Sequence, residues 1–546
     1  MGGPGGAATA RTETRIVVSS VLTGSSRSAL FGGPAWLSVA VAAAFFAFCL
    51  LLQITTGARR ADFAAHPDEA SHFVGSVMVR DYLASGRLAD PLAFARGFYS
   101  HYPFFAVGYW PPAFYSVTAF WFWIAGVGRT QALLVPAVFA AGTAWLIFFL
   151  VRLRAGPIAG ICTGALYLSL PSVQQWMCAV MVDHFTAFFC VAGAACLLRY
   201  LEAPNRRIGL LCAACCACAV LSKYSAAYLV ALPLLAAWLG RRRSLWRRPS
   251  LFLQPVVVAL VVGPWVLWTR HLASYGLPAE KQGLTLARVA SVVGVAFRIF
   301  PPVLMAAVVL GLIALLFLPK LWREDVAMIG LLGAGQLALL LASPVEAEGR
   351  YVLVSAASLL VLSAAGWAGV WSSIPQGARP SAVPFAAAGL VVLFVVFHFG
   401  TYPRPPECAI RTVVQSLQQN PAWLDKRIVV PPDLEGPFIA EFVAQDRQRP
   451  SYYLLRPSKF MASMNWFGGD YRSRFGSSEE AMNYLRDNRV ELIVWHTTPD
   501  LTPHERILAD VLRDDRGWWR RIALFGSGPA SWSVYQRAFQ TGESTD

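Results

Sequence analysis

The chain has 546 residues, of which 56% are apolar and only 14% are charged. Apolar runs of about 20 residues recur along most of its length, which excludes an ordinary soluble globule and indicates a polytopic membrane protein. The net charge of +15 does not indicate a nucleic-acid partner, because basic residues cluster in short loops between apolar runs, as at 241–243 and 247–248. Cytoplasmic loops of membrane proteins have this pattern.

The first apolar segment follows a polar tail, residues 1–33, and is longer than the apolar region of a signal peptide, so we expect it to be retained as a membrane helix. The sequence predicts eleven spans with the N-terminus in the cytoplasm. They are 34–56, 130–151, 157–176, 184–201, 206–222, 225–240, 251–269, 289–318, 326–342, 351–373 and 381–400.

One further apolar piece, Pro111 to Gly126, is predicted to lie along the membrane surface. After Pro111-Pro112 it offers about 14 helical residues, or about 21 Å, whereas the hydrocarbon core is about 30 Å thick. If this segment does not cross the membrane, the basic N-terminal tail and all later basic loops lie on the same side of the membrane, as the positive-inside rule requires. The predicted outer face then holds the long first loop, 57–129.

The most informative motif in that loop is His66-Pro67-Asp68-Glu69, about a dozen residues past the first span. Asp68 is expected to cap a helix that continues through Glu69, since aspartate is a preferred N-cap and acidic residues favour the first turn. A carboxylate near the membrane surface can also act as a general base on a lipid-borne substrate. Asp68 and Glu69 are therefore both candidate catalytic residues.

The same predicted face collects ionisable residues at span ends, where such residues indicate function. Asp183 and His184 open the span at 184–201, and Lys223 interrupts the run between two later spans. A lysine beside an aromatic is also a common interface anchor. As it is cationic, we expect Lys223 to bind an anionic phosphate at this level.

Arg350 and Tyr351 open the span at 351–373, just after Glu346 and Glu348. The planar fork of arginine matches a phosphate, so Arg350 is the first candidate for binding one, with Tyr351 beside it. Glu346 and Glu348 are expected to orient Arg350 or to contact substrate hydroxyls.

From Thr401 the sequence becomes mixed and polar, and strand and helix signals alternate. Residues 401–546 are predicted to form a small α/β domain with a partly parallel sheet. The predicted strands are 427–431, 451–455, 491–495, 521–525 and 532–535, and the predicted helices are 434–445, 478–488 and 504–513.

Taken in order, these motifs resemble the membrane-embedded glycosyltransferases of the GT-C superfamily. The resemblance is to the branch of the protein O-mannosyltransferases and aminoarabinose transferases. It rests on His66-Pro-Asp-Glu, on Leu83-Ala-Ser-Gly86, on Tyr109-Trp-Pro-Pro-Ala-Phe-Tyr115 and on Arg350-Tyr351, and covers most of residues 34–400. Tyr109-Trp110 replaces the acidic-basic pair of the aminoarabinose transferases, so the sugar stays open.

The resemblance implies an inverting transfer of a sugar from a polyprenyl-phosphate donor to a hydroxyl on a lipid, glycan or protein, at the outer face of the cytoplasmic membrane. It implies that Asp68 is the base or its near neighbour, with Glu69 adjacent. Arg350-Tyr351 matches an Arg-Tyr pair common in these enzymes, and together with Lys223 these residues are expected to bind the donor phosphate. The remaining candidates, expected to bind substrate, are His66, Tyr109, Asp183, His184, Glu346 and Glu348.

No cofactor is expected, and the dispersed histidines do not favour a divalent metal. The N-terminus would be cytoplasmic and the C-terminal domain extracytoplasmic. Two alternatives stay open: a transporter or flippase, whose charges would lie in mid-bilayer, and a non-catalytic membrane scaffold.

Overall fold

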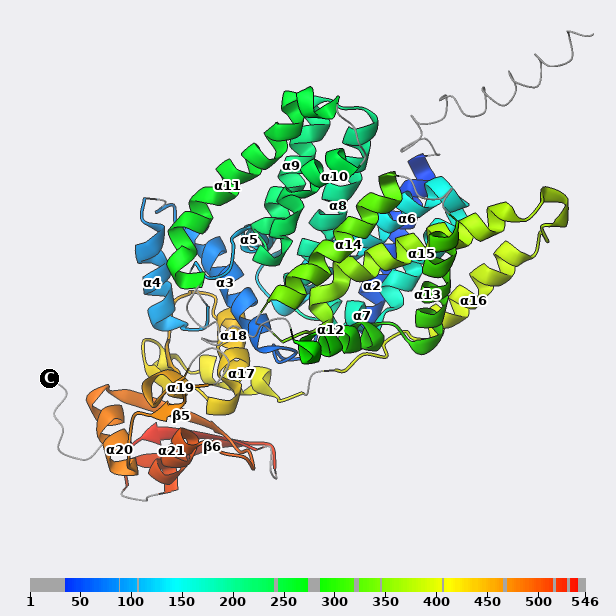
Figure 1. Cartoon of the computed structure of the whole chain (residues 1–546). Helices are drawn as coiled ribbons and strands as arrows, with labels where there is room; N and C mark the ends of the chain where they lie inside the picture. The colour runs from blue at the N-terminus through cyan, green and yellow to red at the C-terminus, as the bar shows by residue number, and fades with distance from the viewer. Residues whose placement is uncertain are drawn as a thin grey trace, which may run out of the picture.

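The computed structural model describes residues 35–538, except for 88, 106–107, 240–243, 274–284, 319–323, 344–345, 405–406, 465–468, 514–516 and 528–530. Within these residues a large bundle of helices adjoins a smaller part that contains the strands (Figure 1). The predicted fold class, a polytopic helical domain followed by an α/β part, is confirmed.

Six helices of the described chain are long and apolar enough to cross a membrane. They are α2 (Ala35–Thr55), α6 (Arg129–Ser169), α8 (Asp183–Glu202), α11 (Pro249–Ala273), α14 (Glu324–Ala342) and α15 (Leu353–Ser373). Shorter segments complete the bundle: α7 (Pro171–Met177), α9 (Arg206–Val220), η2 (Tyr224–Val230), α10 (Leu232–Leu239) and α16 (Val383–Phe397). The count of eleven spans therefore stays a prediction.

Two of the predicted spans differ in the structure. The segment 289–318 is not one straight span: α12 (Leu286–Ile299) and α13 (Pro302–Phe317) meet at 110°, because Pro301 and Pro302 interrupt the helix. The segment 157–176 is divided between the end of α6 and α7, where Pro171 begins the new helix. Within α6 the predicted break at 152–156 is a kink, with Gly156 at φ 84°.

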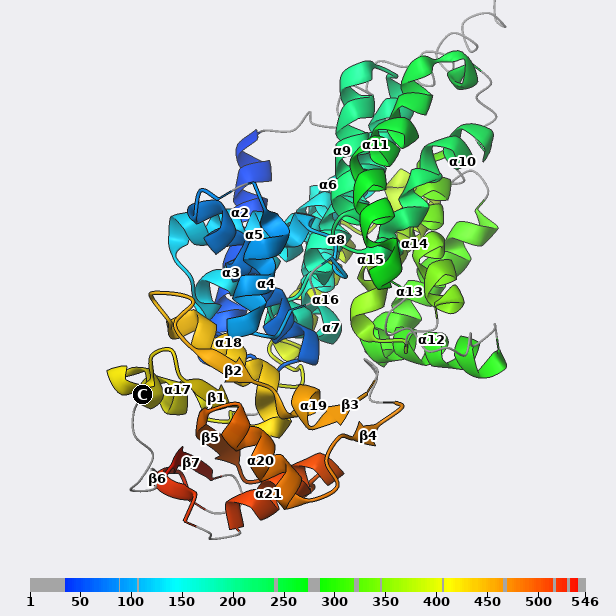
Figure 2. The same ribbon diagram turned by 90° about the vertical axis from the view of Figure 1, so that its left-hand side faces the viewer.

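Three helices of the first loop pack beside the bundle: α3 (Pro67–Ala84), α4 (Pro91–His101) and α5 (Ala113–Ala125) (Figures 1 and 2). The 13 residues of α5 span only about 20 Å at 1.5 Å per residue, too short for a hydrocarbon core of about 30 Å. Its length agrees with the predicted surface helix, and it packs against α3.

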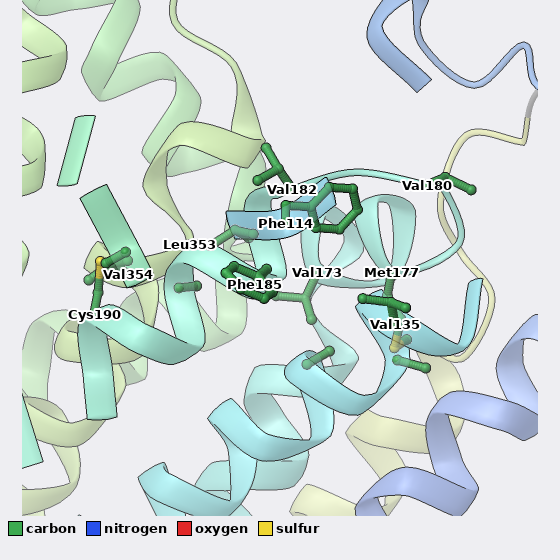
Figure 3. Close-up of a cluster of buried hydrophobic side chains, with 14 of the residues drawn as sticks. Phe114, Val135, Val173, Met177, Val180, Val182, Phe185, Cys190, Leu353 and Val354 are labelled. Carbon is green, nitrogen blue, oxygen red and sulfur yellow. The ribbon is translucent and has the colours of Figure 1, made fainter. Parts of the chain in front are cut away.

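An apolar cluster lies where α5, α6, α7, α8 and α15 meet (Figure 3). Phe114 of α5 and Phe185 of α8 make an edge contact at 6.0 Å between ring centroids. Leu353 and Val354 begin α15 in the same cluster and are buried. Because this packing fixes the first turns of α8 and α15, it also fixes the polar residues that precede or open those turns, Asp183 and Arg350.

The C-terminal part contains a five-stranded sheet in the order β2-β1-β5-β7-β6. Its strands are β1 (Arg427–Val429), β2 (Tyr453–Leu455), β5 (Val490–His496), β6 (Trp519–Phe525) and β7 (Trp532–Arg537), and a separate pair is formed by β3 (Ala462–Ser463) and β4 (Arg472–Ser473). The β1 strand pairs in parallel with β2 and β5, while β7 pairs antiparallel with β5 and β6. The predicted partly parallel sheet is confirmed.

Five helices accompany the sheet: α17 (Ile410–Gln418), α18 (Glu435–Gln445), α19 (Pro457–Phe460), α20 (Ser478–Asp487) and α21 (Pro503–Arg513). Of these, α18 packs against α3, so the C-terminal part adjoins the first loop (Figure 2). Polar contacts fix this interface. Arg449 donates to Asp81 of α3 at 2.9 Å, and the buried hydroxyl of Tyr102 donates to Asp446.

Candidate active site

The start of α3 positions the first candidate carboxylate. His66, not Asp68, is the N-cap: its Nδ1 accepts a hydrogen bond from the backbone N–H of Asp68 at 3.0 Å. The expectation that Asp68 caps the helix is therefore wrong. With Pro67 occupying the first helical position, where its missing N–H costs nothing, the Asp68 side chain is left free to make tertiary contacts.

The main contact of Asp68 is Arg350, whose guanidinium donates to Oδ2 at 2.8 Å. Nδ1 of His66 lies 3.5 Å from the same oxygen. In the part of the chain that the structure describes, Oδ1 accepts no hydrogen bond. Burial would raise the pKa of Asp68, but the nearby Arg350, His72 and His66 outweigh it and hold the pKa below its usual value. Asp68 is thus ionised at neutral pH with one unengaged oxygen.

Arg350 lies at the centre of the cluster, on the single turn η5 (Gly349–Val352) that leads into α15. Its Nε lies 2.8 Å from a carboxylate oxygen of Glu348, and it donates to the hydroxyl of Tyr351 at 2.9 Å. The indole ring of Trp176 faces the guanidinium at 5.6 Å. Since Nε2 of His66 lies 3.8 Å from Glu348, the first loop and η5 are joined twice.

A second ion pair adjoins the first. Lys223, between α9 and η2, donates to Oδ1 of Asp183 at 2.5 Å. The ammonium group of Lys223 also lies 4.2 Å from the ring centre of Tyr351, so Tyr351 contacts both cations. The exposed fraction of the side chain falls from 32% for Glu348 and 25% for Asp68 to 15% for Lys223 and 2% for Asp183. The cluster is therefore open at the Asp68 side and closed at the Asp183 side.

Glu69 takes no part in this cluster. Its carboxylate is fully buried and accepts hydrogen bonds from Arg129 at 2.6 Å, from the backbone of Val180 at 3.0 Å and from that of Ala65 at 3.0 Å. Neighbouring residues on a helix point about 100° apart, which sends Glu69 toward α6 and Asp68 toward Arg350. Both oxygens of Glu69 are engaged, which favours Asp68 as the reacting carboxylate.

Three predicted residues lie away from the two ion pairs or at their margin. His184 is buried, and its Nε2 lies 3.0 Å from the backbone oxygen of Val173, which ties α8 to α7. Tyr109 stacks edge-on against Trp110, and burial together with the charge of Asp68 raises the pKa of Tyr109, so it borders the site. Glu346 is exposed and is not joined to the cluster by any contact between described residues.

Sequence reasoning missed three residues of this region. His72 lies one turn along α3 from Asp68, and the charges of Asp68 and Asp183 act on its buried imidazole. Trp176 packs between His66 and Arg350. Arg129 holds Glu69. The spacing of four residues from Asp68 was a signal for His72, whereas the partners of Trp176 and Arg129 are far away in sequence.

No group of three or more His, Cys, Asp or Glu side chains in the described residues is arranged to hold a metal ion. Arg350 and Lys223 are the cationic side chains of the site that a negatively charged group could contact. Each is already paired with a carboxylate, so an incoming anion competes with Asp68 and Glu348 for Arg350, and with Asp183 for Lys223.

Comparison with known proteins bears on the fold and the family of the chain. A family model described as dolichyl-phosphate-mannose-protein mannosyltransferase matches residues 110–268, under a third of the chain. That stretch includes Asp183 and Lys223. A search of curated proteins gave no match.

Solved structures show the fold over most of the chain. ArnT from Cupriavidus metallidurans in the apo state is similar with a TM-score of 0.59 at 14% identity, over 90% of this chain and 97% of that one. The same protein bound to undecaprenyl phosphate gives 0.56 with the same coverage. The archaeal oligosaccharyltransferase AglB from Archaeoglobus fulgidus gives 0.51 at 12% identity, over 84% of this chain and 69% of that one. The resemblance to GT-C enzymes is confirmed, and at these identities it shows the fold.

Proposed function

We propose that this chain is a membrane glycosyltransferase that moves a sugar from a polyprenyl-phosphate donor to an acceptor hydroxyl. The observation that carries the proposal is the ionised Asp68 beside two cations, with one carboxylate oxygen that no described residue engages. The family match and the shared fold support a glycosyltransferase of GT-C type.

In the proposed reaction Oδ1 of Asp68 takes the proton of the acceptor hydroxyl, and the hydroxyl oxygen attacks the anomeric carbon of the donor sugar. The bond from that carbon to the phosphate oxygen breaks, and polyprenyl phosphate leaves with the electron pair. One direct displacement inverts the anomeric carbon. General-base assistance of this kind contributes on the order of 10²–10⁴-fold to the rate.

Arg350 and Lys223 stabilise the departing phosphate by preorganised charge. Because Arg350 holds Asp68 in the free site, a phosphate that takes over the guanidinium also releases the carboxylate. Losing that neighbour raises the pKa of Asp68 and makes it a stronger base. In this scheme donor binding prepares the base, and the two cations make a divalent metal unnecessary.

The lipid part of the donor has an apolar cavity available beside the site. It measures about 360 Å³ and lies between α3, α4, α5 and α11, where Met78, Tyr82, Tyr115, Trp265 and Trp268 line it. Tyr115 also contacts His72, so the cavity ends next to the charged cluster. A polyprenyl chain is apolar and suits such a lining.

The arrangement of basic loops supports a location in the cytoplasmic membrane, with the N-terminus inside and the C-terminal part outside. On that orientation the charged cluster faces outward, where an acceptor lipid, glycan or protein of the cell envelope is found. Protease added to intact spheroplasts should then cut a tag fused after residue 546 and spare one fused before residue 1.

The activity is tested with the purified full chain in lipid vesicles, supplied with radiolabelled lipid-linked sugars and acceptors from membranes that lack the protein. Wild type should move the label from the polyprenyl-phosphate fraction to a new product. Asp68→Asn should lose about 10²–10⁴-fold in rate, and Arg513→Ala, far from the site, should not. Absence of transfer by wild type would refute the activity, and full transfer by Asp68→Asn would refute the assigned base.

A further inference from the structure

His72 is a buried histidine whose two nitrogens have different environments. The residue is 1% exposed. Nδ1 lies 2.8 Å from the hydroxyl of Tyr115, and the ring packs against Trp110 and Phe114 at centroid distances of 5.2 and 5.8 Å. Nε2 is buried and has no hydrogen-bond partner among the described residues. A buried polar atom left without a partner costs about 1–3 kcal/mol, so it indicates a ligand contact.

His72 faces the charged cluster. It lies four residues after Asp68 on α3, which places both on one side of the helix, and the charges of Asp68, Asp183, Arg350 and Lys223 all act on its ring. Burial, with the two cations, lowers the pKa of His72 to about 4 despite the two carboxylates. The imidazole is therefore neutral at pH 7, with one nitrogen that donates and one that accepts.

Other buried atoms around the cluster also have no hydrogen-bond partner within the described chain, among them Oδ2 of Asp183 and Nε1 of Trp176. Counting backbone and side chain together, Asp183 is 4% exposed and Trp176 is 5% exposed. Trp176 lies beside the cluster, with its ring 5.7 Å from that of His66. The three residues come from α3, α7 and α8. The charge of Arg350 acts on His72 and Asp183, and its guanidinium lies 5.6 Å from the ring centre of Trp176, so all three lie around Arg350.

The chemistry of the three atoms distinguishes between ligands. A phosphate group offers only acceptors, and it would be repelled by the free carboxylate oxygen of Asp183. The single hydroxyl of an acceptor is engaged by the base. A sugar ring carries several hydroxyls, each of which donates and accepts, and its apolar face stacks on an indole ring such as that of Trp176.

We propose that His72, Asp183 and Trp176 form a subsite for the sugar ring of the donor, in which His72 Nε2 hydrogen-bonds a ring hydroxyl and determines sugar specificity. The inference rests on the proposed function. It assigns the sugar ring to the buried residues around Arg350 and leaves the exposed carboxylates, Asp68 and Glu348, for the acceptor.

The test compares binding of two lipids to the purified full chain: the sugar-bearing donor isolated from native membranes, and the bare polyprenyl phosphate obtained from it by mild acid. His72→Phe keeps the ring volume and removes both nitrogens. It should weaken binding of the sugar-bearing lipid by about 10–100-fold, since a lost buried hydrogen bond and 1.4 kcal/mol per tenfold set that scale. Binding of the bare lipid should not change.

Substitution of His72 by two different amide residues distinguishes the roles of its two ring nitrogens. The amide of His72→Gln reaches the position of Nε2 and should restore part of the preference for the sugar-bearing lipid, whereas His72→Asn reaches only Nδ1 and should not. Tyr115→Phe removes the partner of Nδ1 and leaves Nε2, so it should retain most of the preference. His101→Phe, a ring outside the cluster that stacks on Tyr453, is the matched control and should bind both lipids as wild type does.

The outcomes are distinguishable from failure of the proposed function. Equal weakening of both lipids by His72→Phe, or no weakening of either, would overturn the sugar subsite even if wild type transfers sugar normally. Better rescue by Asn than by Gln would also overturn it, because His72 would then act through Tyr115 on structure. Failure of wild type to transfer any sugar refutes the proposed function instead, whatever the two lipids do.

Discussion

Two charged regions adjoin α3, and they use their charges differently. At the C-terminal interface both oxygens of each carboxylate have partners: Asp446 accepts from Tyr102, Gln448 and Ser451, and Asp81 accepts from Arg80 and Arg449. In the cluster around Arg350, Oδ1 of Asp68 and Oδ2 of Asp183 accept no hydrogen bond from any residue that the structure describes. A carboxylate with both oxygens bonded holds parts of the fold together, whereas a carboxylate with a spare oxygen is available to a substrate.

Glu69 belongs with the first kind although it adjoins Asp68 in sequence. Its carboxylate bonds to a buried arginine and to two backbone amides, and it links α3 to α6. The two adjacent acidic residues thus differ in whether a carboxylate oxygen is left without a partner among the described residues. Neither the residue type nor the position in the sequence reveals this difference.

The largest effect on stability is expected at Glu69. Glu69→Gln leaves Arg129 as an uncompensated buried charge, which costs about 3–5 kcal/mol, so the thermal unfolding midpoint in detergent should fall sharply. The transfer rate per folded molecule should stay within a few-fold of wild type. A Glu69→Gln protein that unfolds like wild type but has lost turnover would place Glu69 in the chemistry and break the comparison.

The next largest effect is expected from substitution of Arg350, and it concerns the transfer rate. Arg350→Gln removes charge from the leaving phosphate and should lower the rate about 10²–10³-fold, on the scale of one lost stabilising donor. Arg350 lowers the pKa of Asp68 and burial raises it, so its loss moves that pKa upward. The acid limb of the profile of kcat/KM against pH should therefore shift to higher pH. An unshifted limb would mean that Asp68 is not the titrating base.

A smaller effect is expected at the interface. Asp81→Asn leaves Arg449, whose side chain is 8% exposed, without its charged partner, and a lost bond of this kind costs about 1–3 kcal/mol. Limited proteolysis should cut the C-terminal part faster, while the affinity for polyprenyl phosphate stays at the wild-type value. Weakened phosphate binding would show that the interface also shapes the site.

The smallest effect is expected at an exposed pair. Arg513 and Asp510 lie 2.9 Å apart on α21, with side chains 73% and 54% exposed, and such pairs contribute no more than about 1 kcal/mol. Arg513→Ala should leave both the unfolding midpoint and the transfer rate unchanged. A large loss in either would indicate that α21 has a partner of its own.

Much of the fold was predictable because it follows from local patterns. Short apolar runs marked the strands of the main sheet, as at 491–495 for β5, and the helices α18, α20 and α21 were predicted at 434–445, 478–488 and 504–513, close to their observed bounds. The bend at Pro301 was missed because an apolar run looks continuous whether or not a proline pair divides it. The Pro171 break was missed for the same reason.

The site was only partly predictable. The sequence by itself determined that Asp183, Lys223 and Arg350 lie at the ends of apolar segments and that Asp68 lies shortly after one, since the water-to-hydrocarbon boundary makes such charges stand out along one chain. Only the tertiary structure decided that Asp68 pairs with Arg350 while Glu69 pairs with Arg129, across 282 and 60 residues. It also gave the helix cap to His66 and placed His72 beside the cluster. These contacts depend on which helices pack together. The free energy of that packing is a sum over the whole bundle, so no local sequence pattern predicts it.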